Sequence, residues 1–181
     1  MITASTHHFD WIKPTDNVLI VGGGTGKILP YLSSKNIIDY VEKSPKMISI
    51  AKKKSIGKNV AFHTMDFRNF TSQKQYEVVV SNFFLDLFTP QEIAQFAKQI
   101  HSILAPKGIW LVADFSATNQ LKTIKQKCLL KATIIFFNIF ARHKLNQVFD
   151  IQKIVQHSDF KVIKTTKLNN GMVFASVFKK G

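Results

Sequence analysis

The sequence contains little cysteine and no long apolar run. Its single cysteine, Cys128, excludes a disulfide scaffold and a zinc site built from cysteines. No uninterrupted apolar stretch reaches the roughly 18 residues that a membrane-spanning helix needs, and the first 16 residues hold no apolar run of the kind found in a signal peptide. We therefore expect a cytoplasmic protein with neither a signal peptide nor a membrane span.

Acidic residues are also scarce, and their distribution is uneven. The 181 residues include 25 Lys and Arg against 11 Asp and Glu, a net charge of +14, and residues 115–181 alone hold 12 basic residues and 2 acids. Such an asymmetric charge distribution is typical of proteins that bind an anionic partner, such as nucleic acid or a membrane surface. Only two of the basic residues are arginines, which bidentate recognition of phosphate favours. A lysine-rich solvated surface is therefore the alternative explanation, and nucleic acid is the less favoured partner.

Hydrophobic residues make up 45% of the chain, which is enough for the core of one domain spanning residues 1–181. Short apolar runs predict buried parallel strands, and the segments between them have helical spacing, with Ser44-Pro45 and Thr89-Pro90 as helix starts. The expected strands are residues 17–21, 37–41, 60–63, 77–81 and 109–113, and the expected helices are residues 26–34, 44–54 and 90–104. This alternation predicts a doubly wound α/β fold.

The C-terminal end departs from the alternating pattern. Two strand-like segments, residues 161–166 and 172–178, flank the turn signal Asn169-Asn170-Gly171. They predict an antiparallel hairpin. The expected fold is therefore a mostly parallel seven-stranded sheet that ends in this hairpin.

A glycine-rich segment, Gly22-Gly23-Gly24-Thr25-Gly26, directly follows the first strand. Glycines allow a sharp turn and the close approach of a ligand, and a helix that starts there would offer free N–H groups. Glu42, at the end of the second strand, should lie beside this segment and accept ribose hydroxyls. Together they indicate an adenosine-type ligand. The alternatives are a turn that merely needs glycines and a solvated acid.

The spacing of the glycines narrows the choice of ligand. A dinucleotide fingerprint needs glycine where Lys27 stands, and a phosphate-binding loop needs Ser or Thr where Ile28 stands. NAD and ATP therefore rank below S-adenosylmethionine.

Five segments of residues 11–116 resemble, in order, the motifs of class I S-adenosylmethionine-dependent methyltransferases: VLIVGGGTG, YVEKSPKMISIAKK, FHTMDFRNF, YEVVVSNFFLDLF and LAPKGIWLVADFS. The likeness is nearest to the ubiquinone/menaquinone-biosynthesis branch, and it implies a Rossmann-like methyltransferase fold. It also implies cofactor-binding roles for nine residues. Gly22, Gly23, Gly24 and Gly26 would line the methionine end, Glu42 would bind the ribose, Asp66 and Phe67 would lie at the adenine, and Ser81 and Asn82 would border the sulfonium.

One position departs from this family. Ile20 stands two residues before the first glycine, where the family usually has an acid that organises the methionine end. The departure implies either a weaker cofactor site or a substitute contact. A catalytically inactive cofactor-binding module is therefore one alternative function.

Methyl transfer needs chiefly positioning, with the donor carbon and the nucleophile about 3 Å apart, and it needs a base only if the acceptor loses a proton. Asp86, Asp114 and His63 are the candidate bases, and Asp86 is preferred because it follows the loop expected nearest the methyl group. Their alternative roles are a helix cap, a loop anchor and an ordinary polar residue. His7 and His8 lack ligand partners in the sequence, so we expect no metal site.

The acceptor is indicated by the loop Ser81-Asn82-Phe83-Phe84. Nucleobase amino-methyltransferases resemble one another in a proline-containing loop at this place, and this loop has no proline. Its aromatic character favours a small, apolar or aromatic acceptor. An RNA-modifying methyltransferase is the second alternative function.

Residues 116–149 are expected to form a helical lid. The core of this segment, residues 121–144, carries six basic residues, no acid and a wide apolar arc. The arc could cover a lipophilic acceptor or contact an anionic membrane at its inner face. Ordinary packing of one apolar face against the sheet is the alternative.

Overall fold

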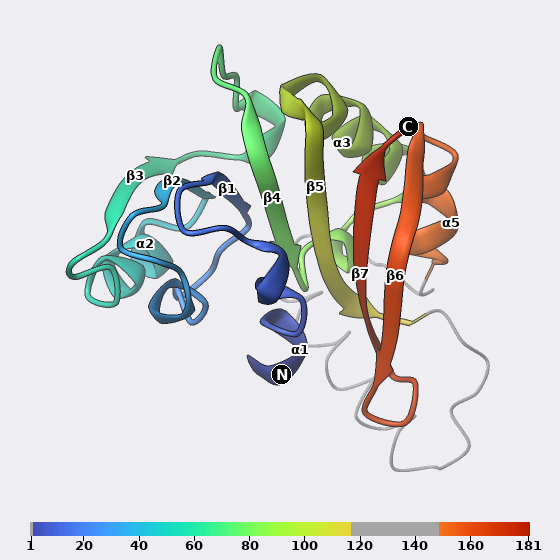
Figure 1. The fold of residues 1–181 in the computed structure, drawn as a ribbon, viewed down its shortest axis with the longest axis horizontal. Coiled ribbons are helices and arrows are strands. Elements are labelled where there is room, and N and C mark those ends of the chain that lie inside the picture. The colour runs from blue at the N-terminus through green and yellow to red at the C-terminus, as the bar shows by residue number, and fades with distance from the viewer. Residues whose placement is uncertain (1, 117–148) are drawn as a thin grey trace.

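The computed structural model describes residues 2–116 and 149–181 of the chain. Its centre is one seven-stranded sheet with the order β3-β2-β1-β4-β5-β7-β6, which can be followed across Figure 1. Strands β1 to β5 are parallel, whereas β7 is antiparallel to both of its neighbours, so it alone runs against the other strands. The predicted mixed sheet and C-terminal hairpin are confirmed. The strands are β1 Asn17–Val21, β2 Ile37–Glu42, β3 Asn59–Thr64, β4 Tyr76–Asn82, β5 Leu104–Phe115, β6 Phe160–Leu168 and β7 Val173–Lys180.

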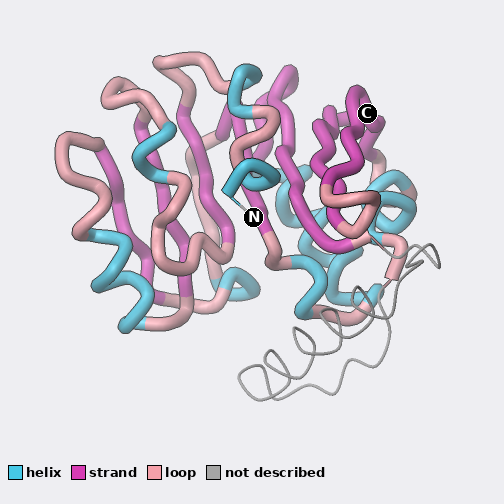
Figure 2. Tube along the Cα trace, turned by 90° about the horizontal axis from the view of Figure 1, so that it is seen from below, coloured by secondary structure: helices cyan, strands magenta, loops and turns pink. Residues whose placement is uncertain are grey.

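Helices lie on both faces of this sheet (Figure 2). Helices α3 and α5 pack on one face, and α2 packs on the other, where α1 contacts β5 and β7. The predicted helix starts are confirmed: Ser44 caps α2, and Thr89 forms a capping box with Glu92 at α3. The α-helices are α1 Ile2–Ser5, α2 Pro45–Lys52, α3 Pro90–Ile103 and α5 Ile151–Gln156, and the 3-10 turns are η1 Phe9–Trp11, η2 Leu29–Tyr31, η3 Phe67–Asn69 and η4 Leu85–Leu87.

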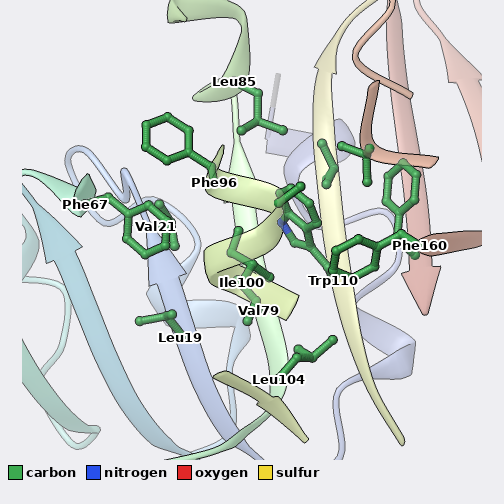
Figure 3. Close-up of a cluster of buried hydrophobic side chains, with 14 of the residues drawn as sticks. Leu19, Val21, Phe67, Val79, Leu85, Phe96, Ile100, Leu104, Trp110 and Phe160 are labelled. Carbon is green, nitrogen blue, oxygen red and sulfur yellow. The ribbon is translucent and has the colours of Figure 1, made fainter. Parts of the chain in front are cut away.

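The larger core lies between the sheet and helices α3 and α5 (Figure 3). Its side chains are almost fully buried, and each contributes about 1.5–3 kcal/mol on transfer from water. They include Leu19, Val79, Phe96, Ile100 and Trp110. The central strands are apolar on both faces because helices cover both faces.

The predicted helix over residues 26–34 is wrong. The structure has only the short 3-10 turn η2 in this region. Gly26 has a φ of +68°, which is outside the helical region. Pro30 lacks an N–H, and in an α-helix its ring would clash with the carbonyl of Gly26. The glycine-rich segment therefore does not open an α-helix and gains no N-terminal donors from one.

The predicted lid over residues 116–149, including Cys128 and the basic residues of 121–144, lies almost entirely outside the described residues. Within the described parts, no helix is long and apolar enough to cross a membrane. The same parts contain no group of three or more His, Cys, Asp or Glu side chains placed to hold a metal ion.

Candidate active site

The glycine-rich segment, here called the glycine loop (residues 22–26), lies at the carboxyl end of β1. Gly22, Gly24 and Gly26 all have φ between +58° and +68°, a region that glycine enters without strain. A Cβ on Gly22 would lie 2.2 Å from the ring of Phe84, and one on Gly26 would lie 2.8 Å from the Cβ of Ala51. Packing therefore also requires glycine at these two positions, because a side chain would clash with these neighbours.

Gly24 differs from the other glycines of the loop. A Cβ built on it would meet no described atom within 4 Å. Its backbone is nevertheless held, because Glu42 Oε2 accepts its N–H at 3.0 Å and Tyr40 Oη donates to its carbonyl at 2.9 Å. Lys54 Nζ donates to the next carbonyl, that of Thr25, at 2.8 Å. The loop is thus ordered by side chains and opens to free space at Gly24.

Glu42 lies beside the loop, as the topology predicts. Its Oε1 accepts the N–H of Ser44 at 2.8 Å, so each carboxylate oxygen receives one backbone donor. An ionised carboxylate has about four acceptor sites. Glu42 therefore keeps acceptor capacity for the two hydroxyls of a ribose, and the space at Gly24 leaves room for the ligand.

The structure places Asp66 at the N-cap of η3, in contact with Arg68. The guanidinium of Arg68 donates from Nε to Oδ1 at 3.0 Å and from Nη2 to Oδ2 at 2.7 Å. These hydrogen bonds are the main reason that the pKa of Asp66 lies below its usual value. Phe67 is 3% exposed and packs in the core against Phe70 and Phe96. An adenine contact would have to share Asp66 with Arg68, and Phe67 contributes mainly packing.

Ser81 and Asn82 point to opposite faces at the end of β4. Ser81 is fully buried, and its hydroxyl accepts the indole N–H of Trp110 at 2.9 Å. Asn82 Nδ2 donates to the carbonyl of Ser5 at 3.0 Å, which ties β4 to the residues of α1. Both side chains therefore have structural partners close to the carboxyl end of the sheet.

The next two residues surround this end of β4 with aromatic rings. Phe83 has a φ of +51°, which is uncommon for a residue with a side chain. The resulting turn packs Phe83 against Phe115 on the α1 face, whereas Phe84 packs against Phe88 and Phe96 on the α3 face. Phe84 also contacts the glycine loop at Gly22.

Two carboxyl groups, those of Asp86 and Asp114, lie next to each other close to these aromatic residues. Asp114 is fully buried on β5, where its Oδ2 accepts the N–H groups of Leu85 and Asp86 at 3.0 and 3.3 Å. The predicted alternative role of Asp114 as a loop anchor is thus confirmed. The Oδ1 of Asp86 is enclosed and has no hydrogen-bond partner among the described residues. Thr89, not Asp86, caps α3.

Burial changes the acidity of both groups. It raises the pKa of Asp86 to about 6. Burial, together with the charge of Asp86, raises the pKa of Asp114 well above its usual value. Burial therefore favours a proton on this pair of carboxyl groups. We assign this proton to Asp114, whose hydrogen bond to Asp86 stabilises the ionised form of Asp86.

His63, the third candidate base, belongs to a separate polar cluster. Its Nε2 lies 2.6 Å from Oδ1 of the buried Asp39, whose Oδ2 accepts from Lys74 and Tyr76 at 3.1 Å. The ring of His63 also packs against Phe70. These contacts give His63 a structural role in the hydrogen-bond network around Asp39, which links β2 and β3.

Comparisons with known proteins identify the family of this chain. Residues 18–108 match the family model described as a methyltransferase domain. A protein of Oceanobacillus iheyensis, named an uncharacterized methyltransferase, is 31% identical over 160 residues, which cover 83% of this chain and 73% of that protein. The chain belongs to the methyltransferase domain family.

Solved structures show the fold that the methyltransferase shares. An S-adenosylmethionine-dependent methyltransferase of Methanosarcina mazei has a TM-score of 0.71 at 15% identity, and the match covers 96% of each chain. The N-methyltransferase NodS of Bradyrhizobium japonicum, solved with S-adenosyl-L-homocysteine, has a TM-score of 0.70 at 12% identity and covers 99% of this chain and 83% of its own. The methyltransferase is an enzyme whose cofactor is S-adenosylmethionine, and the acceptor capacity of Glu42 and the open space at Gly24 fit that cofactor.

The sequence predictions do not include the contacts that Tyr40, Lys54 and Arg68 make in this site. Tyr40 had a recognisable signal, because residues two apart on a strand face the same side, and Glu42 is two residues on. Lys54 and Arg68 had none, since lysine and arginine at such places are usually solvated.

Proposed function

We propose that the methyltransferase transfers a methyl group to a small, apolar or aromatic acceptor, and that it lies nearest the ubiquinone/menaquinone-biosynthesis branch of its family. The observation that carries the proposal is the set of half-buried rings around the end of β4. One of these rings, that of Phe84, contacts the glycine loop at Gly22, so we expect an acceptor at the methyl group to lie against this set of rings. They are Phe83, Phe84 and Phe88.

The cofactor, when bound, supplies a methyl group that is already activated by the positive sulfur. We propose that Glu42 binds its ribose, that Asp66 and Phe67 lie at its adenine, and that the glycine loop with Ser81 and Asn82 borders its methionine end. All of these residues lie at or near the carboxyl ends of the parallel strands, where ligands bind in such sheets.

We further propose Asp86 as the base that accepts a proton from the acceptor, at its Oδ1. That oxygen is enclosed and has no partner among the described residues, and a pKa of about 6 leaves it ionised at neutral pH. Asp114 is then a positioning residue that holds the backbone of the Asp86 turn.

The acceptor class is tested with the full chain and S-adenosylmethionine labelled on its methyl group. We expect label in organic-extractable products from a series of alkylated phenols and quinols, and none in total RNA. Label in RNA alone, falling steeply with salt through counterion release, would replace this proposal with RNA modification. S-adenosylhomocysteine binding without turnover on any acceptor would support an inactive module instead.

Glu42→Ala should weaken S-adenosylhomocysteine binding by about 10- to 100-fold, since a hydrogen bond to a charged group contributes about 1.5–3 kcal/mol. Calorimetry measures the affinity. Glu77→Ala is the matched control, because Glu77 also accepts a backbone N–H, that of Asn17 at 2.8 Å, but at the opposite end of the strands. Unchanged affinity in Glu42→Ala would remove the ribose role.

The proposed place of action is the cytoplasm. Contact with an anionic membrane would fall to the basic residues of 121–144, outside the described residues. Cosedimentation of the full chain with anionic and neutral vesicles at two salt concentrations tests this contact, and equal sedimentation with both vesicle types would argue against it.

A further inference from the structure

The two peptide groups that flank the Cα of Gly24 are held by one strand. Glu42 accepts the N–H on one side at 3.0 Å, and Tyr40 donates to the carbonyl on the other side at 2.9 Å. Tyr40 and Glu42 lie two residues apart on β2, so both side chains reach the same side of the sheet. Together they fix the backbone of the one glycine in the loop that faces open space.

A glycine needs such restraint more than other residues do. Glycine populates positive and negative φ about equally, and Gly24 has a φ of +58° with no atom of the described residues within 4 Å of its Cβ position to favour that value. No α-helix follows the loop to order it. The turn is closed by a hydrogen bond from the N–H of Gly26 to the carbonyl of Gly23 at 3.2 Å, and the side-chain hydrogen bonds at both peptide groups of Gly24 hold it further in this conformation.

Tyr40 is well placed to act as a fixed donor. It is fully buried, its register partner on β1 is the buried Ile20, and its ring fills the space beneath Gly23, where a Cβ would lie 2.2 Å away. Its ring also contacts Phe62 at 5.1 Å. Burial, with the charge of Glu42, raises the pKa of Tyr40, so the hydroxyl keeps its proton at physiological pH. Because the ring of Tyr40 is packed on several sides, the position of its hydroxyl oxygen is fixed as well.

We propose that Tyr40 is a positioning residue of the cofactor site, which sets the Gly24 backbone and, through it, the orientation of the Glu42 carboxylate toward the ribose. Ile20 stands where the family usually has an acid, and the Tyr40 hydroxyl is one of the contacts that order the loop without that acid. The inference rests on the proposed role of Glu42 in binding the cofactor.

Tyr40→Phe tests this role, because it removes one oxygen and keeps the ring. We expect its dissociation constant for S-adenosylhomocysteine to rise about 5- to 10-fold in calorimetry. We also expect faster hydrogen exchange at the Gly24 and Thr25 amides of the cofactor-free protein. The second measurement follows the loop itself and needs neither turnover nor ligand.

Tyr76→Phe is the matched control. Tyr76 is equally buried, and its hydroxyl bonds Asp39 at 3.1 Å, in the cluster under β2 and β3. The control should lower the melting temperature while leaving cofactor affinity and loop exchange unchanged. Equal losses of affinity in both variants would show that Tyr40 contributes only to general stability and would overturn the proposal. Unchanged affinity and unchanged exchange in Tyr40→Phe would overturn it as well.

The double variant Tyr40→Phe/Glu42→Gln separates this inference from the proposed function. If Tyr40 acts through Glu42, the double variant should bind little worse than Glu42→Gln alone, so that the two effects are less than multiplicative. Multiplicative effects would contradict action through Glu42. A weakened Glu42→Gln beside a normal Tyr40→Phe would reject the positioning role and leave the ribose role standing.

Discussion

Gly24→Val should abolish S-adenosylhomocysteine binding while leaving the fold in place. The side chain would project into the open space at the glycine loop, because no described atom lies within 4 Å of the Cβ position. The fold should survive, because the change meets no packed neighbour and adds only the strain of a positive φ, about 1–2 kcal/mol or somewhat more for a branched residue. Calorimetry and thermal unfolding together measure both effects.

Gly57→Val provides the control for backbone strain. Gly57 has a φ of +74° and equally open surroundings, but it precedes β3, at the sheet end opposite to the site. Both variants should lose similar stability, and only Gly24→Val should lose the cofactor. If Gly24→Val bound normally, the glycines of this loop would serve the turn alone.

Asp86→Asn should stabilise the protein at pH 8 and also impair turnover. The pKa of Asp86 is raised by burial to about 6, above the unfolded value near 3.8. A raised folded pKa contributes stability that is present below the unfolded value and is lost as the pH rises through about 6. At pH 8 the native protein therefore holds a buried carboxylate, which asparagine replaces with a neutral group. We expect a gain of about 1–3 kcal/mol at pH 8 and almost none at pH 4.

The same substitution should lower the turnover number by about 100-fold or more on an acceptor that loses a proton, since general bases contribute about 10²–10⁴-fold. The pH–rate profile of the native enzyme should rise near pH 6, and that of Asp86→Asn should be flat there. Normal turnover would exclude Asp86 as the base. An equal stability gain at pH 4 would show that charge burial is not the cause.

The strands were predictable because their signal is local. The last four of the five residues of β1 form an unbroken apolar run between Asn17 and Gly22, and the predicted bounds match the structure. The starts of α2 and α3 were equally clear, since a capping residue and a proline together mark a helix start. The failed helix over residues 26–34 contained its own contrary signals, a glycine suited to positive φ and a proline within the first turns.

The site was predictable only where topology alone decides position. The approach of Glu42 to the glycine loop follows from the parallel order of β1 and β2. The hydrogen-bond partner of Ser81 does not follow from the strand order. Trp110 is 29 residues from Ser81 along the chain, and the orientation of its side chain depends on packing in the whole core. The contact from Arg68 to Asp66 is local, yet nothing in the sequence distinguishes it from a solvated arginine.

The absence of an α-helix directly after the glycine loop, in residues 27–36, changes which ligand groups the loop can bind. A helix N-terminus would add about half a positive charge and free donors, which suit a pyrophosphate. Here the N–H of Gly24 is already used by the Glu42 carboxylate at 3.0 Å, and the Lys54 ammonium lies 2.8 Å from the carbonyl of Thr25. The loop therefore offers neither a helix N-terminus nor the N–H of Gly24 to a pyrophosphate group. Discrimination against adenosine compounds that carry a polyphosphate would then follow from the missing backbone donors.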